Sequence, residues 1–595
     1  MPGLLTRHRR DLVLVLAVAA AASACRPRPR TYVVEDLGIP RTERSVQSSA
    51  LVGGKLLVTL FETKGECRLL VADLASGRQE ELPLPGATGG DGLAVDPAAG
   101  RAYVGTSRKA ALWVYDAASG RASRIEGLDP LLKDETYVWS VAVAPDGRVF
   151  AGTYPGGLLV EHDPRTGRSR SLGAPAPGRK YLRNLVVGPS GRVYCGLGTP
   201  ATVVAVDPGT GAVRRLFEGE APFAGELRLA GGQLCDGAGH CFDVAEPDGA
   251  KVSRREKVEL DEHGRFQVET VGARYTGKID LAARQNGMMT MGLGTGPDGK
   301  VYGGTYYNSS LFVVDPATGR ISALGRVRDA PGEFRIFQEL GAKGLLLPGY
   351  QGPLFLYQVD KPWSEDPAAP NPRKLGEIGQ GQHLATSSDR RGDLVAIGTP
   401  PSYGRRGGGV TIFEVSTLRW RTYTGIVPDQ SVRSLCFGPR DRLYVGTSTE
   451  AGPGEDAGTG AAHLVVLDPA TGRVERDVVP APRATSLNGV APLDGRRVLG
   501  GVETGELFVM DGASGEVRTL ATLPQIRDLK AWKADGSIVG IGWRKGLFRV
   551  DPESLAVEWI PGSPTQLLPG IAEDASGRLY VHDGTRVYRV TPRSP

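Results

Sequence analysis

A unit of about 40 to 47 residues recurs along the 595-residue chain and predicts an all-β fold. Each unit holds short runs of alternating and β-branched residues, and it ends in a phrase of the type Asp-Pro-x-Thr-Gly. Clear copies of this phrase begin at Asp73, Asp116, Asp163 and Asp207 in one group and at Asp468, Asp511 and Asp551 in another. Successive copies within each group are 40 to 47 residues apart. A period of this length is typical of four-stranded β-propeller blades, so the sequence predicts two tandem β-propellers with about 12–14 blades in total.

The turns between the predicted strands are built from a few residue types. In the unit from residue 137 to 173, Asp146-Gly147 provides the positive φ that a tight hairpin needs. Pro164 presets φ at the next corner, Asp163 can accept a backbone hydrogen bond, and Gly167 permits a left-handed residue. These residues are interpreted as structural.

The number of units argues for two rings. The gaps from Asp207 to Asp315 and from Asp315 to Asp468 are 108 and 153 residues, which leaves room for diverged blades near residues 222–283, 333–379 and 380–425. Single propellers close with four to eight blades, so about twelve units are too many for one ring. We expect the first propeller over residues 31–283 and the second over 284–595, with an open boundary and with blades that can be shared between rings.

Composition excludes several classes of protein. The chain has 83 Gly and 43 Pro among 595 residues without a collagen period, and 40% of its residues are hydrophobic, which suits a loop-rich β-protein with a packed interior. No long amphipathic pattern follows the first 25 residues, so helix should be scarce. The net charge of +5 is small and no basic module is visible, so nucleic-acid binding is not expected.

The N-terminus indicates export. Arg7 to Arg10 form a positive region, residues 12–22 are apolar, and Ser23-Ala24-Cys25 forms a small-residue cleavage site, so residues 1–25 are interpreted as a signal peptide. The run Ala-Ala-Ser-Ala-Cys resembles the lipobox of bacterial lipoproteins, although Ala22 stands where Leu is usual. This resemblance implies lipidation of Cys25, residues 26–30 as a Pro/Arg tether, and an outer-membrane or cell-surface location. Simple secretion, or a periplasmic location, is the alternative.

An oxidising compartment changes how the other cysteines are interpreted. Cys235 and Cys241 bracket a short turn, and we expect them to form a disulfide. Cys67, Cys195 and Cys436 are scattered and are interpreted as buried strand residues. A metal site at Cys235, His240 and Cys241 lacks a second ligand cluster with zinc spacing, so no metal is predicted.

Two series of polar and aromatic residues share the same phase of successive units, so propeller symmetry places each series on one face around one axis. Tyr, Trp, Arg, Asn and Gln provide stacking faces and hydrogen bonds suited to a sugar or a carboxylate. The alternative for any one residue is packing within its own blade. The predicted ligand-binding residues are Tyr137, Trp139, Tyr154, Tyr181, Arg183, Gln285, Asn286, Tyr306, Tyr307, Asn308, Arg335, Gln351 and Gln430.

An enzymatic role is a second hypothesis. A lyase for uronic-acid polymers needs a base, a group that neutralises the carboxylate and an acid for the leaving oxygen. Residues of suitable chemistry fall in adjacent units and are predicted as the catalytic set: His383, Tyr350, Tyr403, Arg405 and Arg433. No specific pair of carboxylates for glycoside hydrolysis and no serine-nucleophile motif is visible.

The units resemble the bacterial YVTN, WD40-like and quinoprotein-like propeller repeats over nearly the whole mature chain. Three family motifs are incomplete or absent: the Trp-Asp dipeptide of WD40 repeats, the terminal Trp of the pyrroloquinoline-quinone dehydrogenase motif, and the sialidase Asp box. The resemblance therefore implies a propeller without a quinone, and no cofactor is predicted.

Two functional classes remain open. The first is an exported, lipid-anchored module that binds a glycan or protein ligand through a polar and aromatic funnel. The second is a carbohydrate-active enzyme, in particular a polysaccharide lyase. In both cases we expect a monomer that meets the membrane only through its lipid anchor.

Overall fold

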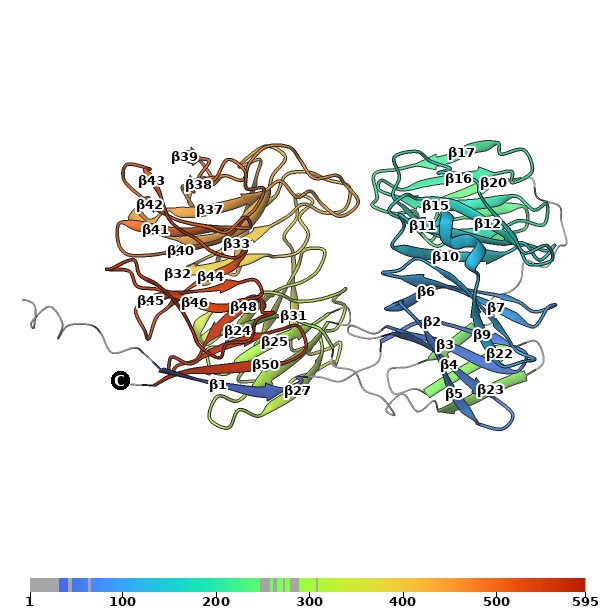
Figure 1. The fold of residues 1–595 in the computed structure, drawn as a ribbon, viewed down its shortest axis with the longest axis horizontal. Coiled ribbons are helices and arrows are strands. Elements are labelled where there is room, and N and C mark those ends of the chain that lie inside the picture. The colour runs from blue at the N-terminus through green and yellow to red at the C-terminus, as the bar shows by residue number, and fades with distance from the viewer. Residues whose placement is uncertain are drawn as a thin grey trace, which may run out of the picture.

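The computed structural model describes residues 31–40, 45–61, 66–244, 246, 257–260, 265–270, 273–278, 288–306 and 309–593. These residues form two β-propeller rings, and Figure 1 shows the rings as two discs that lie face to face. The predicted all-β double propeller is confirmed.

The first ring has six blades among the described residues, four with four strands and two with three. The strands of each blade follow one another from the central channel outward. In chain order the blades are β2 (Ser45–Val52), β3 (Lys55–Phe61), β4 (Cys67–Asp73) and β5 (Gln79–Leu84); β6 (Gly89–Asp96), β7 (Arg101–Ser107), β8 (Leu112–Asp116) and β9 (Arg121–Arg124); β10 (Tyr137–Val143), β11 (Val149–Tyr154), β12 (Leu159–Asp163) and β13 (Arg168–Ser171); β14 (Tyr181–Val187), β15 (Val193–Gly198), β16 (Thr202–Val206) and β17 (Val213–Glu218); β18 (Arg228–Ala230), β19 (Gln233–Cys235) and β20 (Cys241–Asp243); and β21 (Lys257–Leu260), β22 (Arg265–Thr270) and β23 (Ala273–Lys278).

The second ring has seven four-stranded blades. They are β24 (Thr290–Thr295), β25 (Val301–Thr305), β26 (Ser310–Val314) and β27 (Ile321–Arg326); β28 (Gln338–Glu339), β29 (Leu345–Pro348), β30 (Pro353–Tyr357) and β31 (Arg373–Glu377); β32 (Ser387–Arg391), β33 (Leu394–Thr399), β34 (Gly409–Glu414) and β35 (Arg419–Thr424); β36 (Ser431–Phe437), β37 (Leu443–Ser448), β38 (Leu464–Leu467) and β39 (Val474–Val478); β40 (Leu487–Pro492), β41 (Arg497–Val502), β42 (Glu506–Asp511) and β43 (Val517–Thr522); β44 (Ile526–Trp532), β45 (Ser537–Gly542), β46 (Gly546–Val550) and β47 (Val557–Trp559); and β48 (Leu568–Glu573), β49 (Leu579–His582), β50 (Val587–Arg593) and β1 (Thr31–Gly38). The described residues also include three short 3-10 helices, at Glu126–Leu131, Gly341–Lys343 and Pro439–Asp441.

The first described strand belongs to the second ring. β1 pairs antiparallel with β50, from Thr31 opposite Arg593 to Gly38 opposite Val587. In Figure 1 it is the blue arrow in the otherwise green-to-red ring. The prediction that residues 31–38 lie in the first propeller is therefore wrong. The reason is that the last blade lacks a fourth strand of its own, and the N-terminal strand covers the exposed hydrogen-bonding edge of β50.

This closure makes the first ring an insertion. In a simple ring, the outermost strand of the last blade leads directly to the innermost strand of the first blade. Here the chain leaves β1, builds the first ring from β2 to β23, and only then enters β24. The two rings are therefore connected twice.

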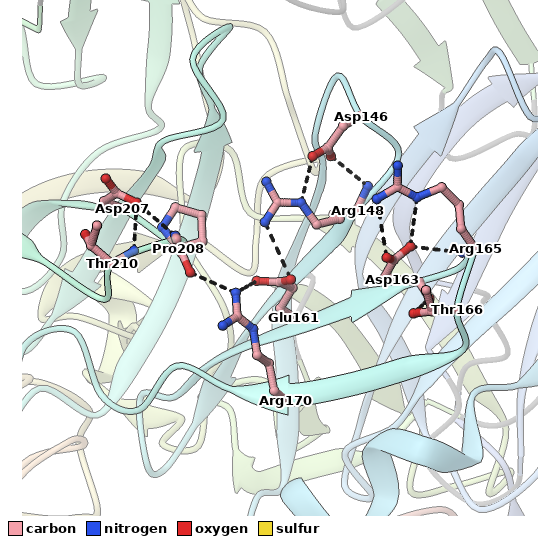
Figure 2. A network of polar contacts seen from close by, with 11 residues as sticks. Asp146, Arg148, Glu161, Asp163, Arg165, Thr166, Arg170, Asp207, Pro208 and Thr210 are labelled. Atoms are coloured by element: carbon pink, nitrogen blue, oxygen red, sulfur yellow. Dashed lines mark hydrogen bonds and ion pairs between the residues drawn. The ribbon is translucent and has the colours of Figure 1, made fainter.

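The repeated Asp-Pro-x-Thr-Gly turns stabilise the blades as their residue types predict. Asp163 Oδ1 accepts the backbone N–H of Arg165 at 3.0 Å, and Gly167 adopts φ +69°. Figure 2 shows that this turn lies beside a polar network that links two blades. In that network, Arg170 binds Glu161 at 2.8 Å and donates to the carbonyl of Pro208 in the next blade at 2.8 Å.

The hydrophobic cores lie between adjacent blades. One such core joins β40–β43 to β44–β47 through Leu499, Ile526 and Phe548, each less than 1% exposed. Small residues leave room for this packing: a Cβ at Gly540 would lie 2.3 Å from the Phe548 ring. The first blade of the first ring likewise packs against the last, where Phe266 contacts the core around Leu56 and Val58.

Cys235 and Cys241 form a disulfide in the short blade β18–β20. The bridge joins the ends of β19 and β20, which pair at these two residues. Cys67, Cys195 and Cys436 are free and buried. The blade with the bridge has only three short strands, so the covalent link adds a constraint where little core is available.

We expect removal of β1 to destabilise the second ring. A chain that starts at residue 39 loses the pairing with β50 and the packing of Tyr32 and Val34 against the core of the last blade. Calorimetry should show the transition of the second ring lowered by about 5 °C or more relative to a chain that starts at residue 31. Identical melting curves for the two chains would contradict the closure.

Candidate functional site

A β-bulge recurs near the start of the innermost strands. The extra residue of such a bulge breaks the pairing register and re-aims its side chain. The extra residues are Gln47, Asp91, Trp139 and Arg183 in the first ring and Met291, Arg433, Asn488 and Arg527 in the second. We call these residues the channel positions, because side chains from different blades meet there.

Hydrogen bonds between blades support the channel positions. The residue that follows a bulge donates to a carbonyl of the next blade: Ser48 to Gly90 at 2.9 Å, Ser140 to Leu182 at 2.9 Å, and Ser434 to Leu487 at 2.7 Å. Thr386 makes the corresponding bond to Val432 at 2.9 Å. These bonds fix the spacing of neighbouring innermost strands and hence the geometry of the channel mouth.

The first ring presents a mixed polar and aromatic mouth. Gln47 Nε2 donates to Asp91 Oδ1 at 3.1 Å, and burial raises the pKa of Asp91 to about 6. The exposed guanidinium of Arg183 lies over the rings of Trp139 and Phe223, at 5.0 and 4.5 Å. The mouth therefore has a cation on an aromatic surface and a carboxyl that titrates near neutral pH.

Aromatic side chains from both rings meet between the two discs. The starts of innermost strands and the ends of second strands lie at the same edge of each antiparallel blade, and in both rings this edge faces the other ring (Figure 1). We define the junction cluster as Tyr137, Trp139, Tyr154, Tyr181 and Phe223 of the first ring with Tyr350, His383 and Tyr403 of the second.

Within the junction cluster, contacts cross from one ring to the other at Tyr403. Its ring lies 4.9 Å from Phe223 and 6.2 Å from Tyr181, both edge-on. Tyr181 in turn stacks on Tyr154 at 4.3 Å. An ion pair between Lys180 and Asp456, at 2.5 Å, also joins the rings.

Tyr350, His383 and Tyr403 form the part of the cluster that belongs to the second ring. The Tyr350 and Tyr403 hydroxyls are hydrogen-bonded to each other, and His383 lies edge-on to both rings at 4.5 and 5.2 Å. Burial raises the pKa of Tyr350, Tyr403 and Tyr181, so their hydroxyls stay protonated at neutral pH.

His383 is a neutral imidazole at neutral pH. Burial, with a smaller effect from the positive charge of Arg335, lowers its pKa to about 4. The side chain is 4% exposed, and Nδ1 is buried without a hydrogen-bond partner among the described residues. A base in this position is screened from solvent by Tyr350 and Tyr403.

The structure separates the predicted catalytic set. Tyr350, His383 and Tyr403 contact one another, whereas Arg433 occupies a channel position. Arg405 is exposed and lines a cavity of about 330 Å³ with Gln380 and Asp429.

The predicted binding residues outside the junction cluster have different surroundings. Arg335 lies by the second-ring channel, and Tyr306 lies 5.8 Å from Phe61 of the first ring. Gln351 is exposed in the turn after β29, and Gln430 is buried and donates to the Ala461 carbonyl at 2.9 Å, which suits a structural role. The predictions for Cys25, Gln285, Asn286, Tyr307 and Asn308 fall outside the described residues.

Sequence reasoning missed four polar channel positions: Gln47, Asp91, Asn488 and Arg527. Three of them directly precede Ser or Gly, as in Gln47-Ser48 and Asn488-Gly489, whereas Arg527 precedes Asp528. Alignment of the innermost strands on that Ser or Gly would have found Gln47, Asp91 and Asn488. Among the described residues, no group of three or more His, Cys, Asp or Glu is placed to hold a metal ion.

Comparisons with known proteins identify no family. No protein-family model and no curated protein matches the chain. Similar solved structures include the extracellular domain of BT4673 from B. thetaiotaomicron, with 11% identity and a TM-score of 0.37 over 94% of this chain and 82% of that chain. PorZ, a surface component of the type-IX secretion system of Porphyromonas gingivalis, has 12% identity and a TM-score of 0.38 over 94% and 86%. Streptogramin B lyase has 11% identity and a TM-score of 0.39 over 51% and 94%. Likeness at this level carries no argument about the site or its ligand.

The burial of His383 predicts an acid-sensitive fold. Its pKa is about 4 in the folded protein and about 6.5 in the unfolded chain, so the unfolded state binds the proton first as the pH falls. The free energy of unfolding should therefore fall between about pH 7 and pH 4. We expect His383→Gln to reduce this fall by about 1–3 kcal/mol. Urea unfolding of parent and variant at pH 7 and pH 4.5 measures the difference, and parallel pH dependences would contradict a buried neutral His383.

Proposed function

We propose that this chain is an exported double propeller that binds a ligand between the facing mouths of its two rings. One observation carries the proposal: the channel positions and the aromatic residues of both rings are turned towards the same junction. Trp139 stacks on Tyr137 at 4.6 Å and carries the exposed cation of Arg183 over its ring. This aromatic and cationic surface is suited to the hydroxyl or acidic groups of a sugar. A glycan is therefore the ligand class that we favour over a protein partner.

Binding fits this geometry better than lyase chemistry does. A lyase base must reach the proton next to the substrate carboxylate. His383 is 4% exposed beneath two tyrosines, and the raised pKa values of Tyr350 and Tyr403 make their hydroxyls poor bases at neutral pH. Arg405, another member of the predicted catalytic set, lines a cavity with Gln380 and Asp429.

Export to an oxidising compartment is part of the proposal. It rests on the signal-type pattern of residues 1–25 and on the Cys235–Cys241 disulfide, since disulfides persist mainly outside the cytosol. None of the helices in the described part of the chain has the length and apolar character needed to cross a bilayer. We propose Cys25 as the attachment point of a lipid anchor.

Replacement of Cys25 tests the anchor. We expect Cys25→Ser to move the protein from the membrane fraction to the soluble exported fraction, because the thiol that would carry the lipid is lost. Ser23→Ala, which keeps the cysteine and a small residue at the cleavage site, should fractionate like the parent. Membrane retention of Cys25→Ser would remove Cys25 as the anchor.

Binding at the junction is tested with a panel of neutral and acidic oligosaccharides on a glycan array, followed by calorimetry of the best ligand. Trp139→Ala should weaken that binding about tenfold, because it removes the aromatic surface beneath Arg183. Trp420→Ala, on the outer strand β35, is the matched control and should leave the affinity unchanged. An equal effect of both substitutions would place the ligand elsewhere, and unsaturated uronide products from any polymer would favour the lyase alternative.

A further inference from the structure

Three arginines enter the mouth of the second-ring channel from alternate blades. Arg433 and Arg527 are channel positions on β36 and β44. In the blade that contains β28, Phe334 forms an isolated β-bridge with Gly349, just after β29. Arg335 directly follows Phe334, so it lies where the bulge residues lie in the other blades. The blades of β32 and β40 separate these three blades, so the arginines are distributed around the axis of the ring. We call them the arginine triad.

The arginines of the triad are close enough for the charge of one to change the pKa of the next. Burial lowers the pKa of Arg433, and the charge of Arg335 lowers it further. Burial and the charge of Arg433 likewise lower the pKa of Arg527. Because a guanidinium stays protonated in proteins, three positive charges meet at this channel mouth.

The triad has few partners of its own. Arg335 forms an ion pair with Glu333 at 3.1 Å. Arg433 Nε donates to Asn488 Oδ1 at 3.3 Å, and Arg527 stacks on Trp543 with its guanidinium carbon 3.6 Å from the ring centroid. In the described residues neither Arg433 nor Arg527 has an ion pair, and the Nε atoms of Arg335 and Arg527 are buried without an acceptor.

Three acidic groups face the triad: Glu333, Asp528 and Glu450. Burial raises the pKa of Glu333 and of Asp528. Glu333 is already paired with Arg335 at 3.1 Å, and Asp528 accepts the Gly570 N–H at 3.0 Å. Glu450, which attracts Arg433, is exposed to solvent and screened by it. Buried N–H donors of Arg335 and Arg527 therefore remain without an acceptor among the described residues.

Partly buried like charges raise the free energy of the empty site, and a bound anion relieves this cost. We propose that the arginine triad binds an acidic group of the ligand, a carboxylate, sulfate or phosphate, at the mouth of the second-ring channel. Planar guanidinium groups match such oxyanions through paired N–H donors. This inference deepens the proposed function, on which it rests, by making the ligand an acidic glycan.

Two probes separate the inference from the proposed function. The first is radiolabelled inorganic sulfate, with phosphate and acetate as competitors, in equilibrium dialysis of the full chain. The second is calorimetry with hexagalacturonate, a sulfated chondroitin hexasaccharide and neutral maltohexaose. We expect the parent to bind inorganic sulfate or phosphate and to prefer one acidic oligosaccharide over the neutral one by about tenfold or more. The preferred oligosaccharide distinguishes carboxylate from sulfate recognition.

Substitutions within the triad assign the effect to these residues. Arg433→Gln and Arg527→Gln should each weaken binding of sulfate and of the acidic oligosaccharide by about 10- to 100-fold, and Arg527→Lys, which keeps the charge but not the paired donors, should have a smaller effect. Arg421→Gln on the outer strand β35 is the matched control and should change affinity less than about twofold. Melting curves verify that each variant is folded.

The outcomes are distinct. Equal binding of acidic and neutral oligosaccharides by the parent, or unchanged affinity in the folded triad variants, overturns the anion site and leaves the binding function intact. Triad-dependent sulfate binding without any oligosaccharide binding supports the anion site and overturns the proposed glycan ligand. Absence of binding to every probe overturns both.

Discussion

The pairing of β1 with β50 is the constraint on which the arrangement of the two rings depends. It completes the last blade of the second ring with a strand from the other end of the chain. Because β1 then continues to β2 and β23 to β24, the first ring is an insertion into the connection between two neighbouring blades. The two connections between the rings lead into β2 and β24, at the edge of each ring where the innermost strands begin. The corresponding faces of the two rings are turned towards each other.

A repeated β-bulge in the innermost strands determines which side chains lie at those faces. In eight of the described blades, a bulge near the start of the innermost strand directs one side chain to the axis. In several of them, as at Ser434, the following residue donates a hydrogen bond to the next blade. The same bulge is formed with different residue types at the bulge position. The first ring carries Gln47, Asp91, Trp139 and Arg183 at these positions, while the second carries two arginines and an asparagine with Met291. The two mouths therefore share geometry but differ in charge.

Burial determines what the junction can do. It holds His383 neutral, keeps the hydroxyls of Tyr350 and Tyr403 protonated, and moves the titration of Asp91 towards neutral pH. Groups with these properties donate and accept hydrogen bonds and offer aromatic surfaces, but they do not form an accessible base. Together with the unfilled N–H donors of Arg335 and Arg527, these groups support the proposed recognition of a ligand.

The blade architecture, the turn chemistry and the phase of the site residues were predictable from local patterns, because they depend on strand alternation and on turns within about 45 residues. The sequence also indicated the Cys235–Cys241 pair, whose two cysteines are neighbours in the chain. The closure of the second ring by residues 31–38 could not be predicted in this way, since edge pairing between distant segments leaves no periodic signal. The same holds for the contact of Tyr181 with Tyr403 and for Arg527: the first depends on how two rings meet, and the second on a one-residue bulge that composition and period do not report.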